Sequence, residues 1–362
     1  MGKNLDRSRF ILTDLLRLSD SGLYCEAGDF YIDPWQPVDR AVITHAHGDH
    51  ARSGSRAYLA SQEGDLLLRA RVGSADTIFQ MVPYGEVVMM NGVRVSLHPA
   101  GHIRGSAQVR VEHGGEVWVV SGDYKRESDP TCTPFEVVRC DTFISESTFG
   151  LPIYRWPPSA DVFSAINTWW RANQDAGKAS IIYGYALGKA QRLLMGVDPS
   201  IGPIFTHGAV ERLNREYREG GVPLPATTYA GSVTGRADWS KALIVAPPSA
   251  HATPWMRKFG TVSTGFASGW MRIRGARRQR SVDRGFVLSD HVDWPSLLQT
   301  ISETGAQRVW VTHGYTSIVS RWLTEHGIES RVIETRFAGE TEESLANDGS
   351  DSNDAGELGT PA

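Results

Sequence analysis

Residues 44–50 read Thr-His-Ala-His-Gly-Asp-His and directly follow the apolar tripeptide Ala-Val-Ile. Three imidazoles and a carboxylate in so short a stretch are costly to bury, because each polar group needs a partner. Imidazole together with carboxylate is the ligand set that zinc and manganese prefer. A turn at the end of a strand can direct His45 and His47 at one ion and Asp49 and His50 at a second. The stretch therefore predicts a two-metal site at a strand end, rather than a polar loop that is merely rich in histidine.

Three more polar residues fit the same site, because each lies beside a glycine where an apolar strand ends. His102 follows Pro-Ala-Gly, Asp123 follows Val-Ser-Gly, and His313 follows Val-Thr and precedes a glycine. Singly, each is typical of a turn residue. Together with residues 44–50 they predict one cluster, in which the carboxylate of Asp123 can bridge two ions.

The composition is that of a globular chain, with 362 residues, 22% charged and 41% hydrophobic, and a net charge of -4. These values exclude a peptide, a fibre and a mostly disordered chain. The three cysteines form no Cys-x-x-Cys pair, so a thiolate zinc site is not indicated. The chain shows neither a run of about 18 apolar residues nor the pattern of a signal peptide, so we expect a cytoplasmic protein with no membrane partner. Residues 338–362 carry acidic and no basic side chains and are expected to form a disordered tail.

The sequence changes character twice along its length. Short apolar and β-branched stretches between Gly, Pro and Asp turns predict strands from about residue 22 to residue 146. Strands and helices then alternate, which predicts a parallel α/β layer, and the first pattern returns past residue 262. This order predicts one domain interrupted by another, with divisions at residues 1–155, 156–261, 262–337 and the tail 338–362. Helices are expected at residues 161–176, 187–195, 209–219, 294–304 and 317–325.

The ligand motifs resemble those of the metallo-β-lactamase superfamily: His-x-His-x-Asp-His, then Ala-Gly-His-Ile-x-Gly-Ser, then Ser-Gly-Asp and a late histidine. Residues 145–150 (SESTFG), 185–191 (YALGKAQ) and 288–291 (LSDH) are similar to motifs of its β-CASP nuclease branch. The resemblance covers about residues 20–335. Within that branch, the stretch Leu-Ser-Asp-His-Val-Asp-Trp is most similar to the bacterial ligase-associated DNA exonucleases, which are relatives of Artemis.

The resemblance implies both a fold and a metal centre. The fold would be of the α/β class, a metallo-β-lactamase αββα sandwich with an inserted β-CASP α/β domain. The cofactors would be two divalent metal ions, zinc or manganese. The resemblance assigns His45, His47 and His102 to one ion, Asp49, His50 and His313 to the other, and Asp123 to a bridge between them. It also implies that Asp33 orients the metal ligands through hydrogen bonds without binding an ion itself. The alternative is that Asp33 is an acidic turn residue before a proline.

Such a centre predicts hydrolysis of a phosphodiester. Two close divalent ions lower the pKa of a shared water to about 7 and neutralise phosphate oxygens. The alkoxide leaving group needs a proton, and His291 beside Glu146 is the expected general acid with its orienting carboxylate. The alternative is that Glu146 caps a turn and that His291 is an ordinary surface histidine. The expected catalytic residues are Asp49, Glu146 and His291.

An arginine-rich segment before His291 is a candidate for nucleic-acid binding. Its guanidinium groups can neutralise phosphates, and the hydroxyl of Ser289 can bind a terminal phosphate. The alternative is a solvated loop. The candidate residues are Arg272, Arg274, Arg277, Arg278, Arg280, Arg284 and Ser289.

We expect a DNA exonuclease that acts on strand ends, 5′ to 3′ and on single strands, in DNA repair. The resemblance also implies a functional link to an ATP-dependent DNA ligase and a helicase. The runner-up is an RNA-processing β-CASP ribonuclease with RNA as its partner, because Artemis-type DNA enzymes have valine where this chain has His313. A hydrolase of small molecules would not require Glu146 and His291. A non-catalytic scaffold would be expected to have lost ligands, whereas every expected ligand is present here.

Overall fold

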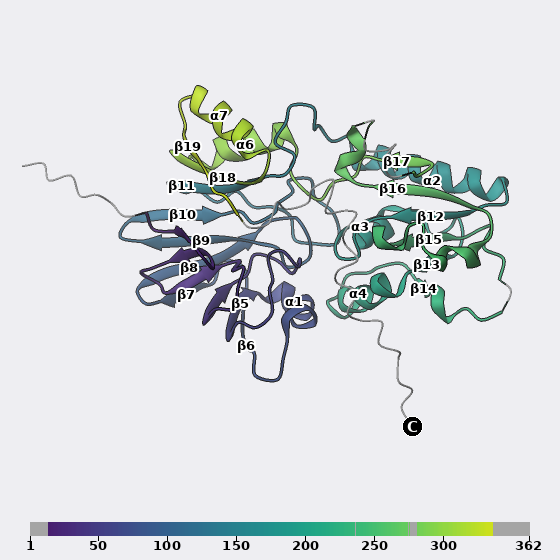
Figure 1. The fold of residues 1–362 in the computed structure, drawn as a ribbon, viewed down its shortest axis with the longest axis horizontal. Helices are drawn as coiled ribbons and strands as arrows, with labels where there is room; N and C mark the ends of the chain where they lie inside the picture. The colour runs from purple at the N-terminus through teal and green to yellow at the C-terminus, as the bar shows by residue number, and fades with distance from the viewer. Residues whose placement is uncertain (1–13, 236, 274, 276–280, 336–362) are drawn as a thin grey trace, which may run out of the picture.

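The computed structural model describes residues 14–335, except residues 236, 274 and 276–280. The described chain is mixed α/β, and its strands form three sheets (Figure 1). Strands from early and late in the chain share the second sheet, whereas the middle of the chain forms the third. Among the described helices, none combines the length and the apolar character needed to cross a membrane.

Strands from the first part of the chain form all of the first sheet and most of the second. The first sheet contains, in spatial order, β1 (Arg17–Ser19), β2 (Gly22–Cys25), β3 (Phe30–Ile32), β4 (Arg40–Val42), β5 (Ala57–Ser61) and β6 (Ile78–Val82). The second contains β19 (Glu329–Val332), β18 (Arg308–Gly314), β11 (Thr142–Ser147), β10 (Glu116–Val120), β9 (Ala107–His113), β8 (Val93–Pro99) and β7 (Val87–Met90). Neighbouring strands β10, β11 and β18 are parallel, so their carboxyl ends meet at one edge.

These two sheets pack face to face because their side chains alternate between the two faces. Val42 of the first sheet and Ile144 of the second lie in one buried cluster between the sheets. Their sequence neighbours Ile43 and Phe143 instead face outward, toward helices. The outer face of the first sheet is covered by α1 (Asp65–Val72), and that of the second by α6 (Trp294–Thr304) and α7 (Thr316–Glu325) (Figure 1). The layers therefore follow the order helix, sheet, sheet, helix.

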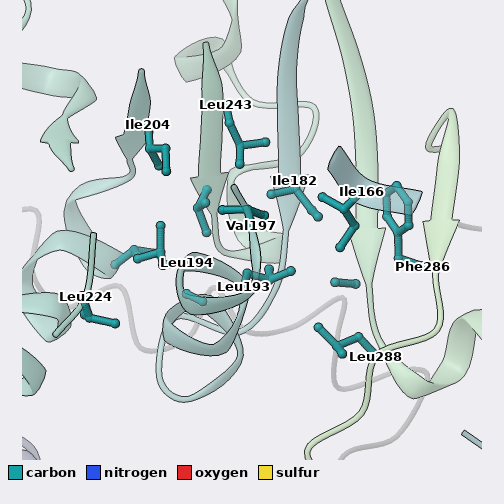
Figure 2. Packing of buried hydrophobic residues seen from close by; sticks show 14 of the residues in the cluster. Ile166, Ile182, Leu193, Leu194, Val197, Ile204, Leu224, Leu243, Phe286 and Leu288 are labelled. Carbon is teal, nitrogen blue, oxygen red and sulfur yellow. The ribbon is translucent and has the colours of Figure 1, made fainter. Parts of the chain in front are cut away.

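The third sheet is parallel throughout and lies beside the first two (Figure 1). Its strands are β14 (Thr228–Tyr229), β13 (Ile204–Thr206), β15 (Leu243–Ala246), β12 (Ala179–Tyr183), β16 (Val262–Ala267) and β17 (Arg284–Phe286). Its helices are α2 (Ser159–Asp175), α3 (Lys189–Gly196) and α4 (Gly208–Glu219). Leu193 of α3 packs toward Ile182 of β12 (Figure 2), and Ile103 from the ligand-bearing loop belongs to the same cluster. A continuous apolar core thus joins the third sheet to the rest of the described chain.

Short 3-10 turns complete the described secondary structure. They lie at Gln62–Gly64, Ala230–Ser232, Pro248–Ala250, Pro254–Phe259 and Gly269–Arg272.

The expected helices agree with the structure to within two residues at each end, and α1 was not predicted. The expected division after residue 261 does not coincide with the end of the third sheet. Strand β16 pairs with β12, and β17 pairs with β16, so the third sheet extends to Phe286. Strand β17 ends at Phe286, and the carbonyl of Asp290 beyond it accepts a hydrogen bond from His102.

Candidate metal centre

Strand ends bring the predicted ligands to one edge of the two packed sheets. Asp123 follows β10, whereas Glu146 lies near the carboxyl end of β11 and His313 near that of β18. These three strands are parallel neighbours. His102 lies in the loop between β8 and β9, which reverses the chain at the same edge because β9 is antiparallel to β10. Residues 44–50 leave β4 of the facing sheet, so both sheets contribute to the site.

The first group of possible ligands contains His45, His47, His102 and Asp123. His47 Nδ1 lies 3.1 Å from His45 Nε2 and 3.1 Å from His102 Nε2. Ligands about 2.1 Å from a tetrahedral zinc ion are about 3.4 Å apart. Asp123 Oδ2 lies 3.6 Å from His45 Nε2 and 3.8 Å from His102 Nε2, so a carboxylate oxygen completes the group.

A second group shares Asp123 and contains His50 and His313. His50 Nε2 lies 3.5 Å from Asp123 Oδ2 and 3.7 Å from Asp49 Oδ2. Asp49 is about one-third exposed and belongs to none of the tight ligand groups found among the described residues. Asp49 is therefore beside the site, at the position expected for it, but its side chain does not complete the second group.

In each of three imidazoles, one ring nitrogen, the inner one, faces the other possible ligands. The second, outer nitrogen is held by the protein, which fixes the tautomer of the ring. His45 Nδ1 lies 3.0 Å from Thr44 Oγ1, and His50 Nδ1 lies 2.7 Å from Asp33 Oδ2. His47 Nε2 lies 3.2 Å from the Leu187 carbonyl oxygen. Acceptors at these positions place the hydrogens on the outer nitrogens and leave the inner nitrogens able to bind an ion.

Asp33 accepts hydrogen bonds from two residues of the site, Thr44 and His50. Its Oδ1 accepts a 2.8 Å hydrogen bond from the Thr44 amide, and its Oδ2 accepts a 2.6 Å bond from the Thr44 hydroxyl. The same Oδ2 accepts from His50. Asp33 also has a positive φ of 45°, a conformation that is uncommon outside glycine.

Burial and charge give these groups distinct protonation preferences. Burial holds the pKa values of His45 and His102 well below the ordinary histidine value, which favours the neutral imidazole that binds metal. Burial also lowers the pKa of His50, but the carboxylates of Asp123, Asp49 and Asp33 outweigh it and raise that pKa well above its usual value. Burial would raise the pKa of Asp123, yet nearby imidazoles, His50 first, hold it well below its ordinary value.

The donor set fits divalent metal ions. His50 Nε2 is buried and makes no hydrogen bond within the described part of the chain, which is costly for a polar atom. Imidazole nitrogens and a shared carboxylate suit zinc or manganese. His45, His47 and His102 each direct one ring nitrogen to a common point, and the other nitrogen of each ring is already held. A cation bound at that point would satisfy this arrangement.

Beside these groups lies a buried pair of His291 and Glu146. His291 Nδ1 is 2.9 Å from Glu146 Oε2, and both side chains are at most 1% exposed. The other oxygen, Oε1, accepts a 2.8 Å hydrogen bond from the Tyr124 amide. Burial raises the pKa of Glu146, although His291 opposes the shift. Glu146 and His291 also form a compact group with Asp123, so the pair lies beside the carboxylate that the two ligand groups share.

Two pockets adjoin the site, and their lining residues differ. One is lined by Asp49, His50 and His313 together with apolar residues that include Trp35. The other is lined by His291 and by charged residues that include Arg126. One pocket thus borders the second ligand group, and the other borders His291.

The structure describes only part of the predicted nucleic-acid segment. Arg272 is exposed, and its Nε donates a 3.2 Å hydrogen bond to the Ile153 carbonyl. Arg284 is exposed and lies over the ring of Phe286. Ser289 is buried, and its hydroxyl accepts a hydrogen bond from the His291 amide. Arg274, Arg277, Arg278 and Arg280 lie outside the described residues.

Sequence reasoning missed the groups that hold the outer nitrogens. Thr44 had a usable signal, since it stands between a strand and the first histidine. The carbonyls of Leu187 and Asp290 had none, because backbone oxygens carry no side-chain identity and lie 140 and 188 residues from the histidines they contact.

Comparisons with known proteins point to one family. No family model matches the chain. It is 32% identical over 318 residues to a protein of Opitutus terrae named "Probable DNA ligase", which covers 86% of this chain and 30% of the relative. It is 28% identical over 170 residues to "Endoribonuclease ysh1" of Aspergillus fumigatus, covering 44% of this chain and 19% of the relative. The chain thus spans less than a third of the length of these relatives.

A solved structure shares the fold. A protein of unknown function from Enterococcus faecalis superposes with a TM-score of 0.53 at 11% identity, over 82% of this chain and 79% of that one. Endoribonucleases of the ysh1 type from further fungi, including Yarrowia lipolytica at 28% identity over 141 residues, match as well. Together with the histidine and aspartate motifs, these relatives fit the β-CASP nuclease family of the metallo-β-lactamase superfamily, which the sequence resembles.

Proposed function

We propose that this chain is a nuclease that hydrolyses phosphodiesters with two divalent metal ions. The observation that carries the proposal is the buried His291–Glu146 pair, which lies against two possible ligand groups that share Asp123. A metal site alone would suit many hydrolases. An imidazole held by a carboxylate beside that site suits a reaction whose leaving group needs a proton.

The proposed chemistry divides between the ions and the chain. Bound ions supply an activated water near neutral pH and neutralise charge on the phosphate. His291 donates a proton from Nε2 to the leaving oxygen, while Glu146 Oε2 accepts from Nδ1 and stabilises the charged ring before transfer. Asp33 and Thr44 hold His50 and His45 in their binding orientation.

We also propose how the fold corresponds to the family. The first two sheets with α1, α6 and α7 would be the metallo-β-lactamase αββα sandwich. The third sheet with α2, α3 and α4 would be the inserted β-CASP domain. Because β16 and β17 pair within the third sheet, the proposed insertion runs from about residue 156 to residue 286, instead of ending at residue 261.

The proposed substrate is DNA, cut from strand ends in the 5′ to 3′ direction on single strands, in DNA repair. The relative named a probable DNA ligase supports this, because its match covers 86% of this chain and lies within a longer polypeptide. The same match supports a functional link to DNA ligation. The link to a helicase and the cytoplasmic location stay predictions. RNA is the second candidate, supported by His313 and by the relatives named endoribonucleases.

A matched pair of substrates tests the proposal. The full chain is incubated with Mn²⁺ or Zn²⁺ and with internally labelled, 5′-phosphorylated DNA and RNA strands of one sequence. We expect mononucleotides from DNA. Degradation of RNA alone would replace the DNA proposal by the RNA one, and cleavage within the strands would replace the exonuclease by an endonuclease. No cleavage of either strand with either metal would contradict the nuclease proposal.

Two variants assign the cleavage to this site. Asp123→Ala should abolish cleavage and reduce bound metal, whereas His291→Ala should reduce cleavage with metal retained. The matched control is Arg171→Met, which removes an exposed arginine of α2 from its ion pair. This variant should leave cleavage unchanged.

A further inference from the structure

Two of the possible ligands are held by the segments around the inserted sheet. His47 Nε2 contacts the carbonyl of Leu187, just before α3, and His102 Nδ1 lies 2.8 Å from the carbonyl of Asp290, just after β17. The outer nitrogens of His45 and His50 are held instead within the first part of the chain. Two of the three imidazoles in the first ligand group therefore depend on distant backbone, whereas His50 of the second group does not.

A buried ion-pair cluster holds the side chain of Asp290 and the backbone beside it. Lys189 Nζ lies 2.8 Å from Asp290 Oδ2, and Arg192 Nη1 lies 3.1 Å from Oδ1. All three side chains are at most 6% exposed. Arg192 also donates to the carbonyl of Ser289, so one guanidinium holds both the side chain and the backbone of this stretch. Burying these charges is costly unless they are paired, so the pairs constrain where α3 and Asp290 lie.

Close packing leaves little room to move where the start of α3 meets the loop that bears His102. Gly188, at the start of α3, has a φ of 87°, and a Cβ there would meet Ile103 Cγ2 at 2.3 Å. Ile103 is the residue after His102. The Gly188 amide also donates a 2.8 Å hydrogen bond to Gln191, which closes the first turn of the helix. Leu288 and Leu193 pack in the same cluster as Ile103 (Figure 2).

We propose that Lys189 and Arg192 are positioning residues for the metal group of His45, His47 and His102. By pairing with Asp290 they keep the carbonyls of Leu187 and Asp290 against the outer nitrogens of His47 and His102. This inference rests on the proposed metal centre and adds that its two sites are supported by different parts of the fold. Because binding and positioning are linked, an ion at this group should in turn hold α3 against the ligand loop.

Zinc binding to the metal-free full chain tests the inference without relying on activity. Zn²⁺ is titrated in competition with a chromogenic chelator. We expect two equivalents to bind to the unaltered chain. In Lys189→Met one equivalent should keep its affinity, and the other should weaken by about tenfold or more, as for other lost supports of metal ligands. Lys189→Arg keeps the charge and a donor and should restore the affinity.

Two further variants distinguish the proposed effect from misfolding and from the cost of an unpaired buried charge. The double variant Lys189→Met/Asp290→Asn removes one buried charge of each sign and should show the same selective weakening. Arg171→Met removes an exposed ion pair of 2.9 Å with Asp198 and should bind zinc as the unaltered chain does. Thermal unfolding without metal shows whether each variant is folded.

The outcomes separate the inference from the proposal beneath it. Two tight sites in the unaltered chain, with both unchanged in Lys189→Met and in the double variant, would overturn the inference alone. Equal weakening of both sites would also overturn it, since that result indicates general loosening. If the unaltered chain bound no zinc, the proposed metal centre itself would be wrong.

Discussion

Replacing His291 by asparagine should slow cleavage according to how much the leaving group needs a proton. In the structure, His291 Nδ1 is held 2.9 Å from Glu146 Oε2, and the other Glu146 oxygen is held by the Tyr124 amide. The carboxylate is therefore fully engaged and can stabilise the charged ring. The His291 carbonyl accepts a 2.8 Å bond from Trp156 Nε1, and this backbone contact survives the substitution.

The expected loss follows from removing one general acid. Such groups contribute about 10²- to 10⁴-fold, which at about 1.4 kcal/mol per tenfold corresponds to about 3 to 5 kcal/mol of barrier. Glu146→Gln should give a smaller loss. Its amide group must face one of two donors, Tyr124 N–H or His291 Nδ1–H, and such a buried conflict costs about 1 to 3 kcal/mol.

The assay compares two substrates under single-turnover conditions, with bound metal measured in parallel. The first is an oligonucleotide with an ordinary alkoxide leaving group. The second is a p-nitrophenyl ester of a nucleotide, whose leaving phenolate is stable without a proton. His291→Asn should lose activity on the first and keep most of it on the second, with metal retained. An equal loss on both substrates, or loss of metal, would refute the role of general acid.

Four further outcomes are expected. Asp123→Asn should lose metal from both sites, measured by elemental analysis, because its Oδ2 serves both ligand groups. Asp33→Asn presents an amide to His50 and should weaken zinc binding at the second group by about 10- to 100-fold in a competition titration. Gly188→Ala should destabilise the chain by about 1 to 3 kcal/mol in thermal unfolding, because a Cβ would clash with Ile103 at a positive φ. Chelation of metal should lower the unfolding temperature, and added Zn²⁺ should restore it, since a ligand of the folded state stabilises that state.

Much of the metal site could be predicted from sequence because its ligands are local or follow strands. Residues 44–50 supply three imidazoles after one strand, and Asp123 and His313 each stand near a strand end beside a glycine. Asp49 shows the limit of this reasoning. Its spacing in the motif is right, yet its side chain points partly to solvent and completes no tight ligand group among the described residues.

The boundary of the inserted sheet could not be read in the same way. Residues 262–267 read Val-Ser-Thr-Gly-Phe-Ala, which indicates a strand without indicating its sheet. Pairing between β16 and β12 joins residues more than eighty positions apart, and periodicity carries no information about such partners. The alternation of strands and helices therefore predicted a parallel α/β layer but not the residue at which that layer ends.

The amino-acid sequence by itself determined the chemistry of the site: which side chains can bind metal, which carboxylate can be shared, and that a histidine with a carboxylate can supply a proton. These properties belong to residue types and short spacings. Only the tertiary structure decided which nitrogen of His47 and which of His102 faces the metal site, because the Leu187 and Asp290 carbonyls that hold their outer nitrogens arrive from 140 and 188 residues away. Backbone oxygens are chemically alike at every position, so their roles arise from packing alone.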